Sequence, residues 1–307
     1  AMSIASYIRE VGSPNHHLAM RDLRPLSGLD FNRYDEFFPA WQSIQSQRRN
    51  EIVRAMVELS EDNVDLDFNT ILYWLLDDTD AAVRVAAVEG LWENESPRML
   101  RRLLEMIKND PSVEVRTAVA ISLSHFVYLS ILQEVPEADG AALERVLTEI
   151  VLDPNQHLEV RRRALEAAGY FSGLNDAVAL EIERCYASDE QLLRESALVA
   201  MGRSMQERWL PTIQSALDHV SPALRYEAAR AAGEMGEYGK PLVPRLVKLA
   251  DDEDSEIALA AIWALGQVGG DAARRTLKRL CKHTDPTRSQ AAEEALGELT
   301  LDESLFG

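Results

Sequence analysis

The sequence predicts an all-α protein, built as a solenoid of stacked antiparallel helix pairs. The first observation is the segment DAAVRVAAVEGL at residues 80–91, in which a hydrophobic residue, an arginine, alanines and a glycine are spaced for an amphipathic helix. The second is that six later segments repeat this pattern. A solenoid also suits a chain of 307 residues, because each unit needs to bury its apolar face only against its neighbours.

The repeats are defined by one key hydrophobic residue, which is Val83 in the first copy. Successive key positions differ by 32, 45, 33, 31, 33 and 31 residues, so each period holds a first helix, a turn and a second helix. The last copy has an arginine at this position, as a terminal repeat with one free face can tolerate. The later key positions are Val115, Val160, Leu193, Leu224, Ile257 and Arg288.

Three regions are expected along the chain. Residues 1–28 form an N-terminal strap or short helix, in which Ile4, Ile8 and Val11 lie on one face. Residues 29–77 form a helical capping region, in which an aromatic-rich helix is followed by a second helix at about residues 47–59. Residues 78–307 form the repeats, which we expect to continue as one solenoid despite an insertion at about residues 126–140.

The insertion accounts for the single step of 45 residues. We expect the second helix to extend by two turns through HFVYLSILQEV, with the following PEADG as the loop back. Long insertions in solenoids often carry function. The extra turns therefore either contact a partner or a second copy of the chain, or pack on the cap or the adjacent repeat. The residues proposed for such a contact are Phe126, Tyr128, Leu129 and Leu132.

The repeated pattern of an acidic turn, Val-Arg, paired alanines and Leu-Gly resembles HEAT repeats, especially the bacterial HEAT-like class also found in phycobilin lyases. The resemblance covers about residues 68–299 and implies a right-handed superhelix whose second helices line the concave face. It also implies that the repeated arginine ties each turn to acidic residues and carbonyl groups. The arginines that match this position are Arg84, Arg116, Arg161, Arg194 and Arg225, and the acidic turn positions are Asp78, Asp110 and Asp252.

Two further expectations concern the ends of the repeats. The recurring glycines are typical of tight helix endings. Ala258 and Ser289 replace the arginine in the last two copies, so we expect the arginine ladder to weaken there. The glycines concerned are Gly169, Gly202, Gly233, Gly266 and Gly297.

A candidate binding face is predicted on the second helices, at positions two, three, six and ten residues after the key hydrophobic residue. In the middle repeats these positions hold arginines and aromatic residues, the composition of binding hot spots. The alternative is a solvated face in which the arginines pair with Glu166, Glu195, Glu227 and Glu234. The predicted partner-binding residues are Arg162, Arg163, Tyr170, Arg203, Tyr226, Arg230 and Trp263.

The composition narrows the classes of partner. With 32 basic and 51 acidic residues the chain carries a net charge of −19, which disfavours nucleic acid and favours a cationic partner. Two cysteines suit a reducing compartment. We find no cleavable signal and no apolar run long enough for a bilayer, so we expect a cytoplasmic protein without a membrane contact.

No catalytic residue and no metal or cofactor site is predicted. The sequence has no phosphate loop, nucleophile elbow or dinucleotide fingerprint, and no His-Glu dipeptide of the kind that holds di-iron in some HEAT-like enzymes. His157, His219 and His283 fall in equivalent turns of different repeats, too far apart to share a metal ion.

The resulting hypothesis is a non-enzymatic scaffold, monomeric or weakly homodimeric, whose concave face binds a peptide or protein. The alternative is a ligand-binding or lyase-like protein that holds an anionic aromatic, tetrapyrrole-like molecule against the arginines. That alternative rests on the resemblance in fold alone.

Overall fold

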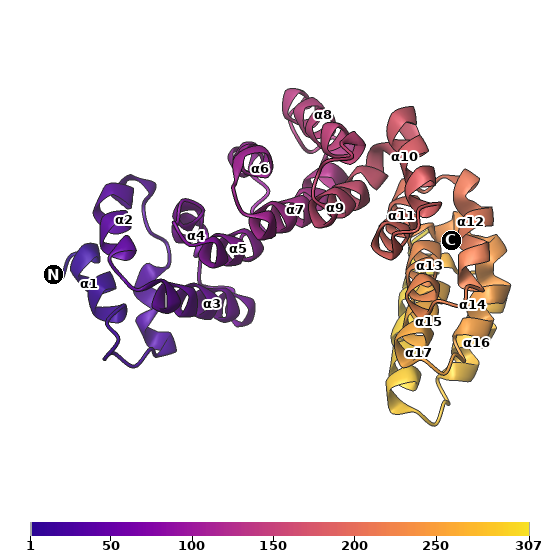
Figure 1. Cartoon of the computed structure of the whole chain (residues 1–307). Helices are drawn as coiled ribbons and strands as arrows, with labels where there is room; N and C mark the ends of the chain where they lie inside the picture. The colour runs from indigo at the N-terminus through magenta and orange to yellow at the C-terminus, as the bar shows by residue number, and fades with distance from the viewer. Residues whose placement is uncertain (1, 307) are drawn as a thin grey trace. The chain divides into compact units, whose positions relative to one another are not determined.

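The computed structural model describes residues 2–306, which contain helices and no strand. The predicted all-α class, a solenoid of helix pairs, is therefore confirmed (Figure 1). The chain divides into two compact units, Ala1–Phe126 and Val127–Gly307. The division predicted near residues 28 and 77 stays a prediction. The α-helices are α1 (Ile4–Val11), α2 (Tyr34–Gln42), α3 (Ser46–Asp62), α4 (Asn69–Leu75), α5 (Ala81–Gly90), α6 (Pro97–Asn109), α7 (Val113–Ile131), α8 (Glu137–Leu152), α9 (Leu158–Ala168), α10 (Asp176–Tyr186), α11 (Gln191–Ser204), α12 (Leu210–Leu217), α13 (Pro222–Glu234), α14 (Val243–Leu249), α15 (Ser255–Val268), α16 (Asp271–Leu280) and α17 (Pro286–Phe306).

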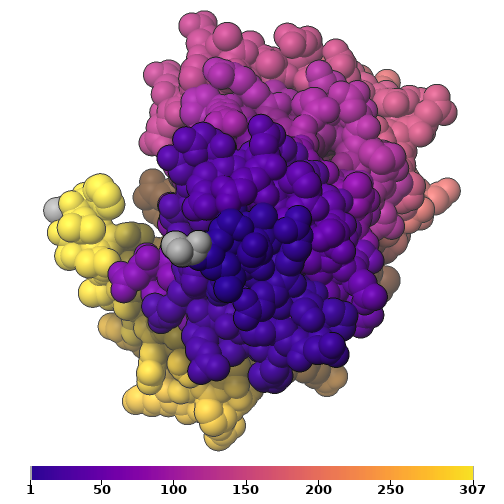
Figure 2. All heavy atoms as spheres, turned by 90° about the vertical axis from the view of Figure 1, so that its left-hand side faces the viewer, coloured from indigo at the N-terminus to yellow at the C-terminus, as the bar shows by residue number. Residues whose placement is uncertain are grey.

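The N-terminal segment folds onto the first helices. The short helix predicted there is confirmed as α1, whose residues Ile4, Ile8 and Val11 are buried. Arg48 of α3 donates hydrogen bonds to the carbonyl groups of Val11 and His16, which hold the segment after α1 in place. In the space-filling view the indigo N-terminal segment forms a continuous surface with the violet helices of the same unit (Figure 2).

Aromatic side chains make the hydrophobic core of the cap. Phe37 and Trp41 on α2 are fully buried, and their rings stack with centroids 5.6 Å apart. Phe37 also contacts Trp74 of α4, with the ring centroids at 5.2 Å. These rings form a shared core between α2 and α4, and the capping role stays a prediction.

In the second unit the second helices of successive repeats lie side by side, in the order α9, α11, α13, α15 and α17 (Figure 1). The recurring glycines lie where these helices touch. A Cβ atom on Gly202 would come within 2.7 Å of the Cα atom of Ala231, and one on Gly266 within 2.9 Å of the Cβ atom of Ala295. Gly202, Gly233, Gly266 and Gly297 are helical residues, so their assignment as helix endings was wrong. Gly202, Gly233 and Gly266 instead allow close packing between neighbouring helices, whereas a Cβ atom on Gly297 would lie in open space.

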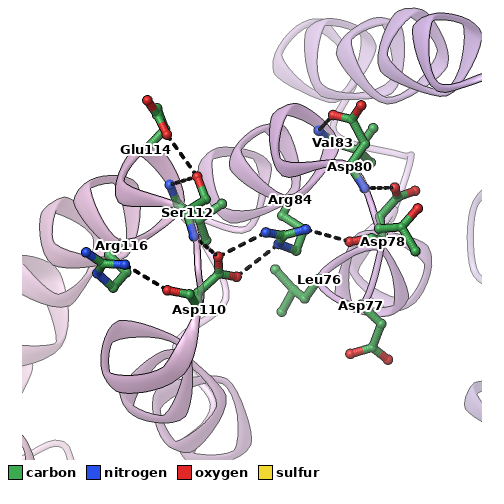
Figure 3. A network of polar contacts seen from close by, with 12 residues as sticks. Leu76, Asp77, Asp78, Asp80, Val83, Arg84, Asp110, Ser112, Glu114 and Arg116 are labelled. Carbon is green, nitrogen blue, oxygen red and sulfur yellow. Dashed lines mark hydrogen bonds and ion pairs between the residues drawn. The ribbon is translucent and has the colours of Figure 1, made fainter.

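The turns are tied together by an arginine ladder, drawn for the first unit in Figure 3. Arg84 donates two hydrogen bonds of 2.9 Å to the carboxylate of Asp110 in the next turn, and a third to the carbonyl oxygen of Asp78 in its own turn. Arg116 donates to the carbonyl oxygen of Asp110 at 2.9 Å. Each arginine therefore satisfies groups in its own turn, and Arg84 also bridges to the following turn.

The ladder begins one layer earlier than the sequence pattern indicates. Arg49 of α3, only 5% exposed, donates from Nε and Nη2 to the Asp78 carboxylate, which also accepts a hydrogen bond from the Trp41 indole at 2.6 Å. The key hydrophobic position before this arginine holds Arg48. Because Arg48 replaces the hydrophobic residue, this layer lacks the repeated Val-Arg pair that marks the later repeats.

In the second unit the ladder is less regular. Arg161 donates to the carbonyl oxygen of Val151 at 3.0 Å and pairs with Glu181. Arg225 donates to the carbonyl oxygen of His219 at 3.0 Å and lies 3.5 Å from Asp252. Arg194 donates to Gln191 of its own helix at 2.6 Å, and within residues 2–306 it makes no bond to a turn carbonyl.

Another arginine partly replaces the ladder arginine that is missing at Ala258. Arg288 of α17 donates to the carbonyl oxygens of Asp252 at 2.8 Å and Ala250 at 3.4 Å. The expected weakening of the ladder at this turn is therefore smaller than the sequence indicated. Arg288, which replaces the last key hydrophobic residue, therefore binds turn carbonyl groups as a ladder arginine does.

The insertion lengthens α7, as predicted, but only to Ile131, and the loop of residues 132–136 comes earlier than expected. Gln133 takes a left-handed conformation with φ 61°, and α8 already begins at Glu137. Pro136 lies in the loop as expected, but assigning residues 137–140 to it was wrong, since Glu137 and Asp139 favour the positive end of a helix dipole. Gly140 faces α7, where an added Cβ atom would lie 2.7 Å from the Ser130 hydroxyl.

The ladder supports a quantitative prediction. Replacing Asp110 with alanine leaves the nearly buried guanidinium of Arg84 without its carboxylate, and we expect the free energy of unfolding to fall by about 3–5 kcal/mol. The matched control is Asp251→Ala. Its pair with Arg279 is about half exposed on both sides, so a loss below about 1 kcal/mol is expected. Denaturant unfolding followed by circular dichroism measures both, and equal losses would contradict a structural role for the ladder.

Candidate protein-binding face

The residues predicted to bind a partner all lie in the second unit, along its row of second helices. Arg162 and Arg163 lie on α9, and Tyr170 lies on the short 3-10 helix η4 (Gly169–Leu174) that follows it. Arg203 is on α11, Tyr226 and Arg230 are on α13, and Trp263 is on α15. All seven side chains are partly exposed, and we call this set the arginine–aromatic face.

A buried carboxylate joins α9 to α11 beneath this face. Glu166, only 8% exposed, accepts hydrogen bonds from Arg163 at 3.0 Å and from the Ser196 hydroxyl at 2.7 Å. The same serine accepts a hydrogen bond from Arg162 at 3.0 Å. Arg203 donates to the carbonyl oxygen of Glu166, also at 3.0 Å. The arginines are therefore held in fixed orientations by one network.

Two arginines stack on aromatic rings. The Arg230 guanidinium lies 3.9 Å from the centre of the Trp263 ring, and that of Arg203 lies 5.1 Å from the centre of the Tyr170 ring. Gly233 makes room for the tryptophan, because a Cβ atom there would overlap the ring. Such cation–π pairs hold flat, partly exposed rings ready for contact.

Carboxylates crowd the centre of the face. Burial, and then the neighbouring charges of Glu166 and Glu195, raise the pKa of Glu227 to about 7, although Arg230 and Arg163 oppose the shift. Glu227 is therefore only partly ionised near neutral pH. A cationic group brought here would relieve the repulsion among the three carboxyl groups.

Each of the two interpretations of the sequence, a binding face and a solvated ion-pair face, predicted part of this arrangement. The arginines do pair with carboxylates, as the alternative proposed, but Arg162 and Glu166 have only 11% and 10% of their side chains exposed. The face is therefore a packed surface rather than a solvated one. Sequence reasoning missed Ser196, which stands where the adjacent repeats have Arg163 and Glu227, and it missed Glu159, which lies 3.2 Å from Arg162.

A family model described as HEAT repeats matches residues 68–149 and 210–297. The chain belongs to the HEAT-repeat family. The predicted resemblance is thereby confirmed.

Solved structures show the same fold. Yeast importin-β (Kap95p) is 12% identical with a TM-score of 0.54, and the match covers 96% of this chain and 46% of that one. Importin-β in an ammonium sulfate condition is 13% identical with a TM-score of 0.50, covering 96% and 44%. The CpcE–CpcF complex of phycocyanin lyase from Nostoc sp. PCC7120 is 16% identical with a TM-score of 0.49, covering 75% and 94%. The sequence matches none of the curated proteins with which it was compared.

The contact predicted for the insertion stays a prediction for part of its residues. Tyr128 and Leu132 are 45% and 48% exposed, and the Tyr128 ring lies beside Tyr170 with the centroids 5.6 Å apart. Phe126 and Leu129 are buried and belong to the packing of α7. Tyr128 therefore borders the arginine–aromatic face of these HEAT repeats.

Histidine and cysteine side chains elsewhere in the chain are the other groups that can carry chemistry. No cluster of three metal-ligating side chains occurs within residues 2–306, and His16 bonds to Asp22 at 3.0 Å. Cys185 and Cys281 are both free, and burial raises the pKa of the Cys185 thiol to about 11, so it is a poor nucleophile. In the same part of the chain no helix is long and apolar enough to cross a membrane.

The raised pKa of Glu227 predicts a pH-dependent stability. Because the folded pKa of about 7 exceeds the ordinary value of 4.5, folding favours the protonated carboxyl, and this stabilisation is lost as the pH rises through about 7. Glu227→Gln cannot ionise. We expect it to be more stable than wild type by about 1–2 kcal/mol at about pH 8, after allowing for partial exposure.

At about pH 4 the two proteins should have nearly equal stability, since Glu227 is then protonated in both the folded and the unfolded chain. Denaturant unfolding at the two pH values gives the difference directly. A variant that is destabilised at pH 8 would show that the Glu227 carboxylate is needed by its arginine neighbours.

Proposed function

We propose that this HEAT-repeat protein is a non-enzymatic scaffold that binds a peptide or protein partner through the arginine–aromatic face. The observation that carries the proposal is the pair of cation–π stacks, Arg230 on Trp263 and Arg203 on Tyr170. Arginine, tyrosine and tryptophan are the residues most enriched in binding hot spots. Here they are partly exposed and already oriented, which lowers the entropic cost of binding.

The packing beneath the face supports the same proposal. Ser196 and Glu166 lock the arginines of α9 to α11, while Gly233 seats the tryptophan of α15 against α13. Contact residues held on packed helices keep their geometry better than residues on loops. A rigid surface of this kind suits a partner of defined shape.

The charges on the face favour a partner with cationic groups. Three carboxyl groups meet at Glu227, where burial and mutual repulsion raise the pKa to about 7. A lysine or arginine side chain of a partner would be attracted to this point. The anionic, tetrapyrrole-like ligand of the alternative hypothesis would instead add charge of the same sign, so the geometry favours the protein partner.

We place the scaffold in the cytoplasm as part of the same proposal. Both cysteines are free thiols, and one is partly exposed, which suits a reducing compartment.

The proposal predicts that Arg230→Ala combined with Trp263→Ala weakens partner binding at least about tenfold, since it removes one complete stack. Tagged wild type and variant would be used to capture proteins from host lysate. The captured partner would then be purified and its affinity measured by calorimetry. Circular dichroism would confirm that both proteins are folded.

The matched control is Tyr238→Ala combined with Arg279→Ala, which also removes one aromatic ring and one arginine. Both residues are about half exposed, and Arg279 belongs to a first helix, α16. This control should bind like wild type. A partner that binds the double variant of the face without loss, or a turnover activity that depends on the face residues, would contradict the proposal.

A further inference from the structure

The first unit holds a cleft that the proposed function does not use. Helices α5, α6 and α7 enclose about 610 Å³, a volume typical of binding pockets for small ligands and anchoring side chains. Its walls are mostly apolar and include Leu91, Met99, Leu103, Ala118 and Phe126. The cleft lies wholly within residues 88–126, so it does not depend on how the two units are arranged.

Two large apolar side chains that line the cleft are exposed to solvent. Trp92, just after α5, is 62% exposed, and Ile121 on α7 is 52% exposed. A tryptophan and an isoleucine exposed around one apolar cleft are typical of an interaction site rather than of ordinary surface. Neither residue is needed to close the core beneath, where Leu91 and Leu103 are almost fully buried.

The cleft is also acidic. Glu89, Glu93 and Glu95 line it, whereas no lysine or arginine does. Arg54 pairs with Glu89 at 2.9 Å, and His125 bonds to Glu95 at 2.7 Å. Glu93 is exposed, and among residues 2–306 it has no hydrogen-bond or ion-pair partner. The cleft thus combines an apolar interior with a carboxylate free to receive a cation.

We infer that this cleft is a second binding site, which takes one large apolar side chain of a partner peptide flanked by lysine or arginine. The apolar anchor fills the space between α6 and α7 and packs on Trp92. The flanking cations meet Glu93 and its two acidic neighbours. Apolar burial supplies the affinity, and the complementary charge supplies the orientation and the preference for basic segments.

A second copy of this chain fits the cleft less well. Its most exposed apolar segment is the end of α17, where Leu301, Leu305 and Phe306 are 58%, 65% and 88% exposed. Asp302 and Glu303 lie within that segment. They would meet the acidic lining with charge of the same sign, and the two chains would each carry −19.

The two sites use the same position in the repeat but carry different residues there. Glu89 and Ile121 stand six residues after Val83 and Val115, as Arg230 and Trp263 stand six residues after Leu224 and Ile257. Equivalent places on the second helices therefore carry an acidic and apolar surface in one unit, and an arginine–aromatic surface in the other. The cleft is a site of its own and does not rest on the proposed function.

The experiment uses the full chain and fluorescein-labelled peptides with a central tryptophan flanked by lysines. Fluorescence anisotropy gives the dissociation constant. We expect peptides with a central alanine, or with glutamate in place of lysine, to bind at least about tenfold more weakly. Trp92→Ala should weaken the lysine-flanked tryptophan peptide by a similar factor. Because Trp92 is exposed, this variant should keep its fold.

Charge and location are tested with matched variants. Glu93→Lys should weaken binding by about threefold or more, whereas Asp35→Lys should not change it. The control makes the same charge change at an exposed residue of α2. Arg230→Ala combined with Trp263→Ala should also bind the peptide like wild type, which separates this site from the arginine–aromatic face.

The inference is overturned if the tryptophan and alanine peptides bind equally, or if Trp92→Ala has no effect. Loss of peptide binding in the double variant of the second unit would place the peptide on the other face and also overturn it. Sedimentation that shows a wild-type dimer dissociated by Trp92→Ala would identify the occupant as a second copy of the chain, against the inference.

Discussion

The structure depends on one recurring interaction, in which an arginine at the start of a second helix binds its own turn and, in most layers, a neighbouring acidic group. Arg84 shows both parts of this interaction, with two bonds to Asp110 and one to the carbonyl of Asp78. A turn between packed helices leaves carbonyl groups that need donors, and the guanidinium supplies several at fixed angles. Since such pairs are nearly buried, they fix the register between layers more than they add net stability.

The ladder and the packing between second helices together involve only some of the positions in each second helix. The arginine occupies one edge, and the glycines and alanines bring neighbouring helices close, as Gly202 does with Ala231. The position six residues after the key hydrophobic residue takes no part in the ladder, although in α9 it holds the buried Glu166. It holds Glu89 and Ile121 in the first unit, and Arg230 and Trp263 in the second. One frame therefore presents two surfaces of different chemistry.

Much of the frame could be predicted because it is local. Periodic apolar residues identify α1 and the second helices wherever neighbours agree with the pattern. The errors arose where a residue serves a distant contact. The glycines at 202 and 266 were taken as helix endings, but they adjoin Ala231 and Ala295, which come from the next repeat. Arg288 was taken as a lost core position, although it reaches carbonyl groups more than thirty residues away.

The sequence by itself determined the class, the repeat and the family, because a repeated pattern needs only nearest neighbours to bury its apolar face. It also identified the arginines and aromatic residues of the candidate face. Only the tertiary structure decided that Glu166 and Ser196 hold those arginines, that burial raises the pKa of Glu227, and that Trp92 borders an apolar cleft. Burial and contact between repeats depend on distances across helices, and a linear pattern does not contain them.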